Sequence, residues 1–266
     1  MPYESIIVTK KDHIATVTFN RPARRNAITP VMCQELVTAL RELDSDADTR
    51  VVVLTGAGEG FCAGGDTRRM TGGKEEKLPT PVDFRQELRT GPQQVILTLQ
   101  RMQKPTIAMV NGAAAGAGFD FACACDLRIA SEKARFLSSY IRIGLFPGAG
   151  GTWLYPRVMP FCKALEYLYT GDSLDAKEGE KIGFLNKAVP ASDLEKETMA
   201  LARKIAAGPP IAMGLARLQA YKGLGMELEA ALEWASAAET ITIGTEDHKE
   251  GIAAFRDKRP PRFQGK

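Results

Sequence analysis

The sequence predicts an α/β protein whose second half is mostly helical. Strand-like and helix-like stretches alternate over residues 5–130, and the apolar spacing becomes mainly helical after Gly148. A chain of 266 residues with 44% hydrophobic content is long enough to bury a full core. Alternating strands and helices favour parallel strands that are joined by crossover connections.

The first elements are a predicted hairpin and a helix. Residues 5–9 and 14–19 alternate in polarity as two strands do, and residues 10–12 supply a turn between them. Thr29 and Pro30 then provide an N-cap and a first-turn proline, which predict that a helix begins there.

Three further strands are predicted at residues 50–55, 106–110 and 127–130. The second of these runs into a tight turn rich in small residues, and a helix follows with Asp120 near its start. Amides at a helix N-terminus carry a partial positive charge and can hold an oxygen that becomes negative. This part of the chain is therefore suited to carbonyl chemistry.

The remaining segments are helical or polar. Helical periods cover residues 152–169, 193–207 and 211–255, with breaks at 171–172 and 208–210. The polar segment at residues 71–90 is interpreted either as a flap over a site or as a solvated insertion, and the insertion is favoured.

Composition excludes several classes of function. Thirty-five basic and 32 acidic residues are mixed along the chain, so the net charge of +3 gives little reason to expect nucleic acid or a membrane as partner. No signal segment or long apolar run is recognised, and a cytoplasmic location is expected. The five cysteines form no C-x-x-C motif, so reduced thiols are expected. Cys123 and Cys125 are interpreted as small buried residues, and no metal is predicted.

A second glycine-rich stretch, residues 54–66, also follows a strand. Its glycine spacing does not fit a dinucleotide-binding loop, because Phe61 stands where the third glycine is required. NAD binding is therefore not expected. The amides near Gly64 and Gly65 could instead face those of Ala117 and Gly118 across one carbonyl oxygen, which would make an oxyanion hole.

Residues 61–66 (FCAGGD) and 111–120 (NGAAAGAGFD) resemble the two oxyanion-hole signatures of the enoyl-CoA hydratase/isomerase (crotonase) superfamily. Other blocks that are similar to the family follow in family order, at residues 20–27, 144–152, 170–172 and 255–263. The resemblance covers essentially the whole chain.

The resemblance implies a crotonase-like spiral of ββα repeats with a helical C-terminal region. Residues 1–195 would form the spiral core with the CoA and oxyanion sites, and residues 196–266 would serve trimerisation and act as a lid. It also implies a homotrimer or a dimer of trimers. Each subunit would bind an acyl-CoA thioester, and no separate cofactor is expected because CoA is part of the substrate.

The resemblance also assigns roles to residues. The amides of Gly65 and Ala117 would bind the thioester oxygen and stabilise an enolate. Hydratases of this family place two glutamates around a water molecule, whereas this chain has Asp120 and Tyr140 at those positions. Arg142 is the nearest residue in sequence that could lower the pKa of the Tyr140 phenol.

Each of these residues also has an interpretation without a catalytic role. Asp120 could be a helix N-cap, although catalysis is favoured. Tyr140 could shape the wall of the acyl pocket without taking part in the chemistry. Glu75, Glu76 and Glu87 could each supply a replacement carboxylate, but each is more often a solvated surface acid.

The resemblance further implies that basic residues bind the CoA phosphates. Arg24, Arg68 and Arg69 lie near the first hairpin and the oxyanion loop, and Ala63 lies within the first signature. Lys258 resembles a phosphate contact that is made across a subunit boundary. Solvated surface charge is the alternative for each basic residue.

The predicted activity is reversible hydration of a 2-enoyl-CoA to a 3-hydroxyacyl-CoA. A non-standard substrate is expected because both usual glutamates are replaced. The alternatives are double-bond isomerisation of an enoyl- or dienoyl-CoA, hydrolysis or ring opening of a cyclic acyl-CoA, and an inactive acyl-CoA-binding subunit. Neither histidine lies in a recognised motif, so covalent catalysis is not expected.

Overall fold

The structure is a computed structural model that describes residues 3–66 and 80–266. Its larger sheet has the strand order β1-β2-β3-β4-β6-β9, in which β1 is antiparallel to β2 and the other neighbours are parallel. The strands of this sheet are β1 (Ile6–Lys11), β2 (Ile14–Phe19), β3 (Val51–Gly56), β4 (Thr106–Val110), β6 (Leu127–Ser131) and β9 (Lys187–Val189). A smaller sheet contains β5 (Ala113–Ala115), β7 (Arg135–Leu137) and β8 (Ser173–Asp175).

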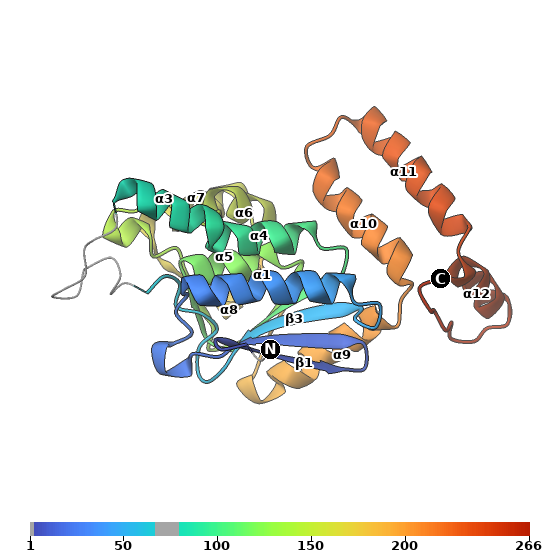
Figure 1. The fold of residues 1–266 in the computed structure, drawn as a ribbon, viewed down its shortest axis with the longest axis horizontal. Helices are drawn as coiled ribbons and strands as arrows, with labels where there is room; N and C mark the ends of the chain where they lie inside the picture. Colours follow the sequence, from blue (N-terminus) through green and yellow to red (C-terminus); the bar gives the residue numbers. More distant parts are fainter. Residues whose placement is uncertain (1–2, 67–79) are drawn as a thin grey trace.

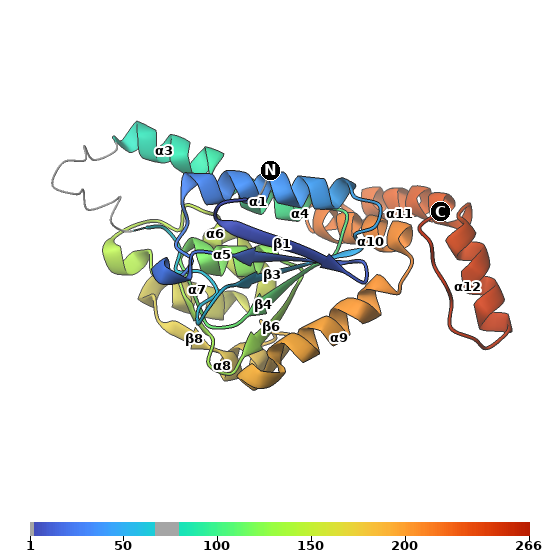
Figure 2. The ribbon, with the colours of Figure 1, turned by 60° about the horizontal axis from the view of Figure 1, so that its bottom comes forward.

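Helices cover both faces of the larger sheet. The α-helices are α1 (Pro30–Ser45), α3 (Pro81–Thr90), α4 (Pro92–Arg101), α5 (Ala117–Ala124), α6 (Gly151–Val158), α7 (Phe161–Thr170), α8 (Ala176–Lys181), α9 (Leu194–Ala206), α10 (Pro210–Gly223), α11 (Leu228–Ile243) and α12 (Glu246–Arg256). Short 3-10 turns are η1 (Pro22–Arg24), η2 (Ile141–Ile143) and η3 (Ala191–Asp193). Figure 2 shows α1 and α9 on opposite faces of the sheet. Every residue of β3 is buried, as expected for a parallel strand between helical layers.

The local signals that predict the first helix act as expected. The side chain of Thr29 accepts a hydrogen bond from the Met32 N–H, and Pro30 occupies the first helical position. This arrangement satisfies one amide that has no partner within the helix. The five predicted strands are likewise present; two have the predicted bounds, and the bounds of the other three differ by one or two residues.

Successive turns of the chain stack as ββα units. In one turn β4 leads into β5 and α5, and in the next β6 leads into β7. These turns pair in parallel, β4 with β6 and β5 with β7. The earlier turns, which begin at β2 and β3, join the stack through parallel bridges from Cys62 to Ala114 and from Ile28 to Gly65. The chain therefore rises as a spiral, and the bends after the short strands lie side by side.

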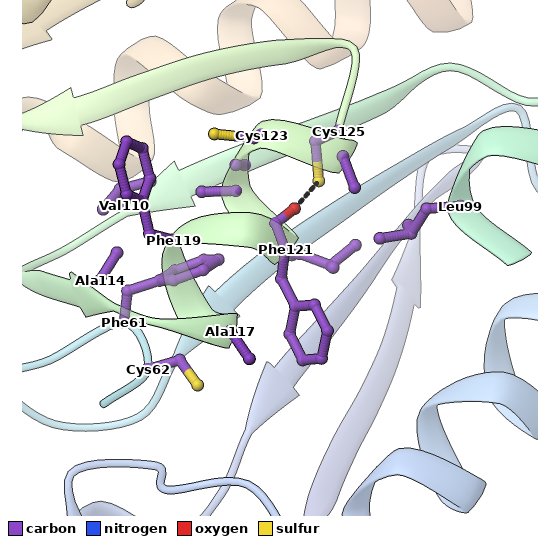
Figure 3. Packing of buried hydrophobic residues seen from close by; sticks show 14 of the residues in the cluster. Phe61, Cys62, Leu99, Val110, Ala114, Ala117, Phe119, Phe121, Cys123 and Cys125 are labelled. Atoms are coloured by element: carbon purple, nitrogen blue, oxygen red, sulfur yellow. Dashed lines mark hydrogen bonds between the residues drawn. The ribbon is translucent and has the colours of Figure 1, made fainter. Parts of the chain in front are cut away.

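Helix α5 lies at the centre of the core, and all eight of its residues are buried. Its aromatic residues pack within a cluster of phenylalanine rings, with Phe119 5.5 Å from Phe136 between ring centroids. Figure 3 shows the side chains of Cys123 and Cys125 leaving the end of this helix in different directions. The Cys125 thiol lies 3.5 Å from the carbonyl oxygen of Phe121. The interpretation of both cysteines as buried small residues is confirmed.

The C-terminal helices leave the body of the molecule. Helix α9 still packs on the sheet, whereas α10, α11 and α12 extend to one side (Figures 1 and 2). Arg217 attaches α10 to the core through an ion pair of 2.8 Å with Asp126, and both side chains are largely buried. The expected boundary after residue 195 falls near the start of α9. The division of roles between the two parts stays a prediction.

Candidate active site

A cavity opens between the first turn of α1, helix α3 and the loop that follows η2. Its volume is about 880 Å³ including its mouth. The described residues that line it are mostly apolar and include Phe84 and Leu88 from α3, and Leu145 and Phe146 from the loop. Gly65, Ala117 and Tyr140 also line this cavity. Three predicted site residues therefore line the same cavity.

The two glycine-rich bends are in direct contact. Gly64 has a φ of +80°, and a methyl group added to it would lie 2.5 Å from the Ala115 oxygen and 3.3 Å from the Ala117 nitrogen. The Ala115 N–H donates a 2.9 Å hydrogen bond to the carbonyl of Cys62. Glycine is required at Gly64, because any side chain there would push the bends apart.

Gly65 and Ala117, one from each bend, line the cavity, and their main-chain N–H groups have no partner in the part of the chain that the structure describes. Within residues 3–66 and 80–266, neither the Gly65 N–H nor the Ala117 N–H donates a hydrogen bond. Ala117 is the first residue of α5, where the N–H groups have no partner within the helix. A pair of such donors can bind an oxygen on which negative charge develops.

Asp120 lies one helical turn behind Ala117 and is fully buried. Its Oδ2 accepts a 2.7 Å hydrogen bond from the Tyr140 hydroxyl, and its Oδ1 accepts one of 2.7 Å from the Tyr155 hydroxyl. Burial raises the pKa of the Asp120 carboxyl to about 7, although both hydrogen bonds act to lower it. The N-cap of α5 is Gly116, so the N-cap interpretation of Asp120 is wrong.

Tyr140 connects the cavity with this buried carboxyl group. It lines the cavity, and its hydroxyl donates to Asp120. Burial and the nearby Asp120 raise the pKa of the Tyr140 phenol well above its usual value. The expectation that Arg142 lowers this pKa is wrong, because Arg142 is exposed and its guanidinium lies 3.5 Å from Asp172. Tyr140 is therefore a neutral hydrogen-bond donor to Asp120 that also forms part of the pocket wall.

Tyr155 is the residue of this site that sequence reasoning missed. It lies on α6, is completely buried, and stacks on Phe119 with ring centroids 4.4 Å apart. No motif connects it with Asp120, because 35 residues separate the two in the sequence. Only the packing of α6 against α5 brings them together.

The polar segment before α4 is partly at the cavity. Residues 80–90 are described, and α3 places Phe84, Glu87 and Leu88 on the cavity wall. Helix α3 has no buried residue, so it is solvated as expected, but one of its sides also lines the cavity, and the choice between flap and insertion stays open. Glu87 lies at the cavity and not on open surface, whereas Glu75 and Glu76 fall outside the described residues.

Among the described residues, Arg24 and Ala63 lie near each other, whereas Lys258 lies far from both. Arg24 is exposed at the end of η1, and the Ala63 N–H donates to the carbonyl of Arg25. Lys258 follows α12, which Figure 1 shows at the opposite end of the molecule from α3. Arg68 and Arg69 lie outside the described residues.

A spiral of ββα turns with a cavity at its adjacent bends defines a class of α/β proteins. Comparison with known proteins shows which family of this class the chain belongs to. The model of the enoyl-CoA hydratase/isomerase family matches residues 9–266. The chain belongs to this family, and the expected crotonase fold is confirmed. Within the described residues, no helix is long and apolar enough to cross a membrane.

Similar proteins carry related names. The chain is 36% identical to (E)-benzylidenesuccinyl-CoA hydratase from Thauera aromatica over 96% of each chain. It is 34% identical to short-chain-enoyl-CoA hydratase from Clostridium acetobutylicum over 97% of each chain. The crystal structure of an enoyl-CoA hydratase from Bacillus anthracis superposes with a TM-score of 0.92 at 33% identity, covering 99% of this chain and all of that one.

Proposed function

We propose that this protein catalyses the reversible hydration of a 2-enoyl-CoA to a 3-hydroxyacyl-CoA. The observation that carries the proposal is that Gly65, Ala117 and Tyr140 line one cavity, and that within the described residues the Gly65 and Ala117 N–H groups donate no hydrogen bond. The carboxyl group of Asp120 is hydrogen-bonded to that hydroxyl from behind. A thioester whose oxygen lies at the N–H pair would present its adjacent carbons to Tyr140.

The reaction then needs one water molecule and one proton carrier. The water oxygen bonds to C3, the double bond is lost, and the electrons move to the thioester oxygen, where the N–H groups of Gly65 and Ala117 stabilise the enolate. A proton of the water passes to Tyr140 while the Tyr140 proton passes to Asp120. Asp120 then returns its proton to Tyr140 while Tyr140 gives the proton that came from the water to C2, so that the product contains all atoms of the water.

The apolar side chains that line the cavity favour a substrate with an apolar acyl group. Phe84 and Leu88 face it from α3, and Leu145 and Phe146 face it from the loop after η2. Such side chains favour alkyl or ring-bearing groups by removing apolar surface from water. A substrate with a bulky apolar acyl group is expected, in line with the replacement of both family glutamates by Asp120 and Tyr140.

Isomerisation of a double bond is the second candidate, and a specific observation favours it. Asp120 and Tyr140 form a single carboxyl–phenol pair, which can remove a proton from one carbon and return it to another. That reaction needs the same enolate but no water. The mass of the product separates the two reactions, because hydration adds one water molecule and isomerisation leaves the mass unchanged.

CoA binding and assembly belong to the same proposal. Arg24, Arg68 and Arg69, with the backbone at Ala63, would bind the CoA portion of the substrate, and no other cofactor would be needed. Lys258 would reach a CoA phosphate only in a neighbouring subunit of a trimer or a dimer of trimers. Exposed apolar side chains on α11 and α12, among them Leu228, Leu232, Ile252 and Phe255, support such an assembly.

Incubation with a panel of straight-chain, aromatic and alicyclic 2-enoyl-CoAs tests the proposal. Mass spectrometry of the products, with a thiol assay in parallel, should show addition of water without release of free CoA. Free thiol would indicate hydrolysis instead, and binding without turnover would indicate an inactive acyl-CoA-binding subunit. Either result would overturn the proposed hydration.

A further inference from the structure

We infer that Tyr155 is a positioning residue, whose hydroxyl holds Oδ1 of Asp120 so that Oδ2 stays beneath the Tyr140 hydroxyl. This inference rests on the proposed function, since it concerns how the proton carrier is held. Tyr155 is completely buried and does not line the cavity, so it acts through Asp120 and not on the substrate.

The two phenol hydroxyls donate to different oxygens of the Asp120 carboxylate. Each hydroxyl lies 2.7 Å from a different oxygen, and the two come from different elements, Tyr155 from α6 and Tyr140 from the residue before η2. Rotation about the last torsion of an aspartate has only a broad preference. A bond at Oδ1 therefore fixes the direction in which Oδ2 points.

Tyr155 is itself held rigidly. Its ring stacks on Phe119, which makes an edge contact with Phe184 at 5.6 Å. Gly151 is also close to this pair, because a methyl group added there would lie 2.9 Å from both Cζ of Tyr155 and Oδ1 of Asp120. The stacked ring and the close approach of Gly151 leave the Tyr155 hydroxyl little room to move away from the carboxylate.

The hydrogen bond from Tyr155 stabilises the negative charge of Asp120, and the other groups around this carboxylate show why it matters. The titratable groups that influence the site are Tyr155 from α6, Tyr140, Cys123 on α5 and Cys62 beyond Tyr140. Arg128 on β6 is buried and acts on Cys123, and its guanidinium donates to the carbonyls of Ala122 and Cys125 at the far end of α5. Helix α4 also packs on α5, and its one charged residue, Arg101, is exposed at its end. Among the described residues, no cation contributes to the pKa of Asp120. The two phenols are the groups that stabilise its anion.

The test is Tyr155→Phe, which removes one hydroxyl and keeps the ring. The matched control is Tyr167→Phe, a buried tyrosine on α7 that makes no bond to Asp120. Difference infrared spectroscopy follows the carboxyl band of Asp120 during a pH titration, with Asp120→Asn to assign the band. We expect Tyr155→Phe to shift the midpoint upward by about one pH unit, a tenfold weaker acid, because a donor to the anion is lost. The control should not move it.

The pH profile of kcat/KM gives a second readout. Its acidic limb should move upward by the same amount in Tyr155→Phe, with KM unchanged at high pH. Phe119→Leu, which removes the stacking partner of Tyr155, should shift the band in the same direction. An infrared midpoint in Tyr155→Phe that equals the parent value would overturn the inference. If the band shifts as expected but no acyl-CoA is turned over, the inference holds and the proposed function fails.

Discussion

The hydroxyl of Tyr140 lies 2.7 Å from Oδ2 of Asp120, and it stands between this buried carboxyl group and the cavity. In the reaction that we propose, Asp120 therefore acts on the substrate through the phenol. The proposal thus assigns to a shorter acid and a tyrosine the work that two glutamates would do. In this proposal the phenol would cover the distance that the shorter side chain leaves, and it remains neutral because its pKa is raised.

Tyr140→Phe should lower kcat by roughly 10²-fold or more, because the path of the proton is broken, and it should change KM little. Steady-state kinetics on the best substrate of the panel measures both constants. Tyr167→Phe removes a buried hydroxyl elsewhere and should keep the parent rate. If Tyr140→Phe keeps the parent kcat, Tyr140 is only a pocket wall.

The rate should depend on the ionisation of Asp120. Burial raises the pKa of this carboxyl from 3.8 to about 7, and only its anion accepts a proton from Tyr140. We expect kcat/KM to fall tenfold for each pH unit below about 7. A pH profile measured with a substrate that does not itself titrate checks this. A rate that stays constant down to about pH 5 would rule out Asp120 as the base.

The same shift predicts how stability varies with pH. Because the folded pKa is raised, the contribution of Asp120 to stability is complete below about pH 4 and is lost as the pH rises through about 7. Asp120→Asn carries no buried charge and should be more stable than the parent above pH 7, by roughly 4 kcal/mol at most. Denaturant unfolding at several pH values measures the difference. An equal difference at all pH values would contradict the linkage.

The contact between the two bends can be tested at Gly64. Gly64→Ala would place a methyl group 2.5 Å from the Ala115 oxygen and should separate the N–H groups of Gly65 and Ala117. We expect a loss of roughly 10²-fold in kcat. The matched control is Gly183→Ala, with a φ of +77° against +80° and no atom within 4 Å of the added methyl.

Both glycine variants should lose about 1–2 kcal/mol of unfolding free energy from the left-handed backbone alone. Only Gly64→Ala should also lose activity. Kinetics and denaturant unfolding of the two purified variants separate these effects. Equal activity in both would mean that the close approach of the bends has no role in the chemistry.

Local signals explain why so much of the fold could be predicted. The cap at Thr29, the apolar run of β4 and the breaks near Gly171 and Gly208 each depend on a few neighbouring residues. The two glycine-rich bends could be found in the same way. That they touch follows from the stacking of parallel turns, which the alternation of strands and helices already indicates.

The partners of Asp120 could not be predicted in the same way. Tyr155 is 35 residues away and meets Asp120 only through the packing of α6 on α5. Arg142 is close to Tyr140 in sequence, but it points to Asp172 at the surface. Distance along the chain says little about distance in space once the chain has turned through a short 3-10 helix such as η2.

The central claim is that Asp120, through Tyr140, moves a proton at the carbon next to a thioester. The most direct measurement is exchange of hydrogen for deuterium at C2 of a saturated acyl-CoA in D₂O, followed by mass spectrometry. This exchange requires the enolate but neither water addition nor a double bond. The parent protein should incorporate deuterium at C2, and Asp120→Asn should incorporate almost none. Exchange at the parent rate in folded Asp120→Asn would contradict the claim.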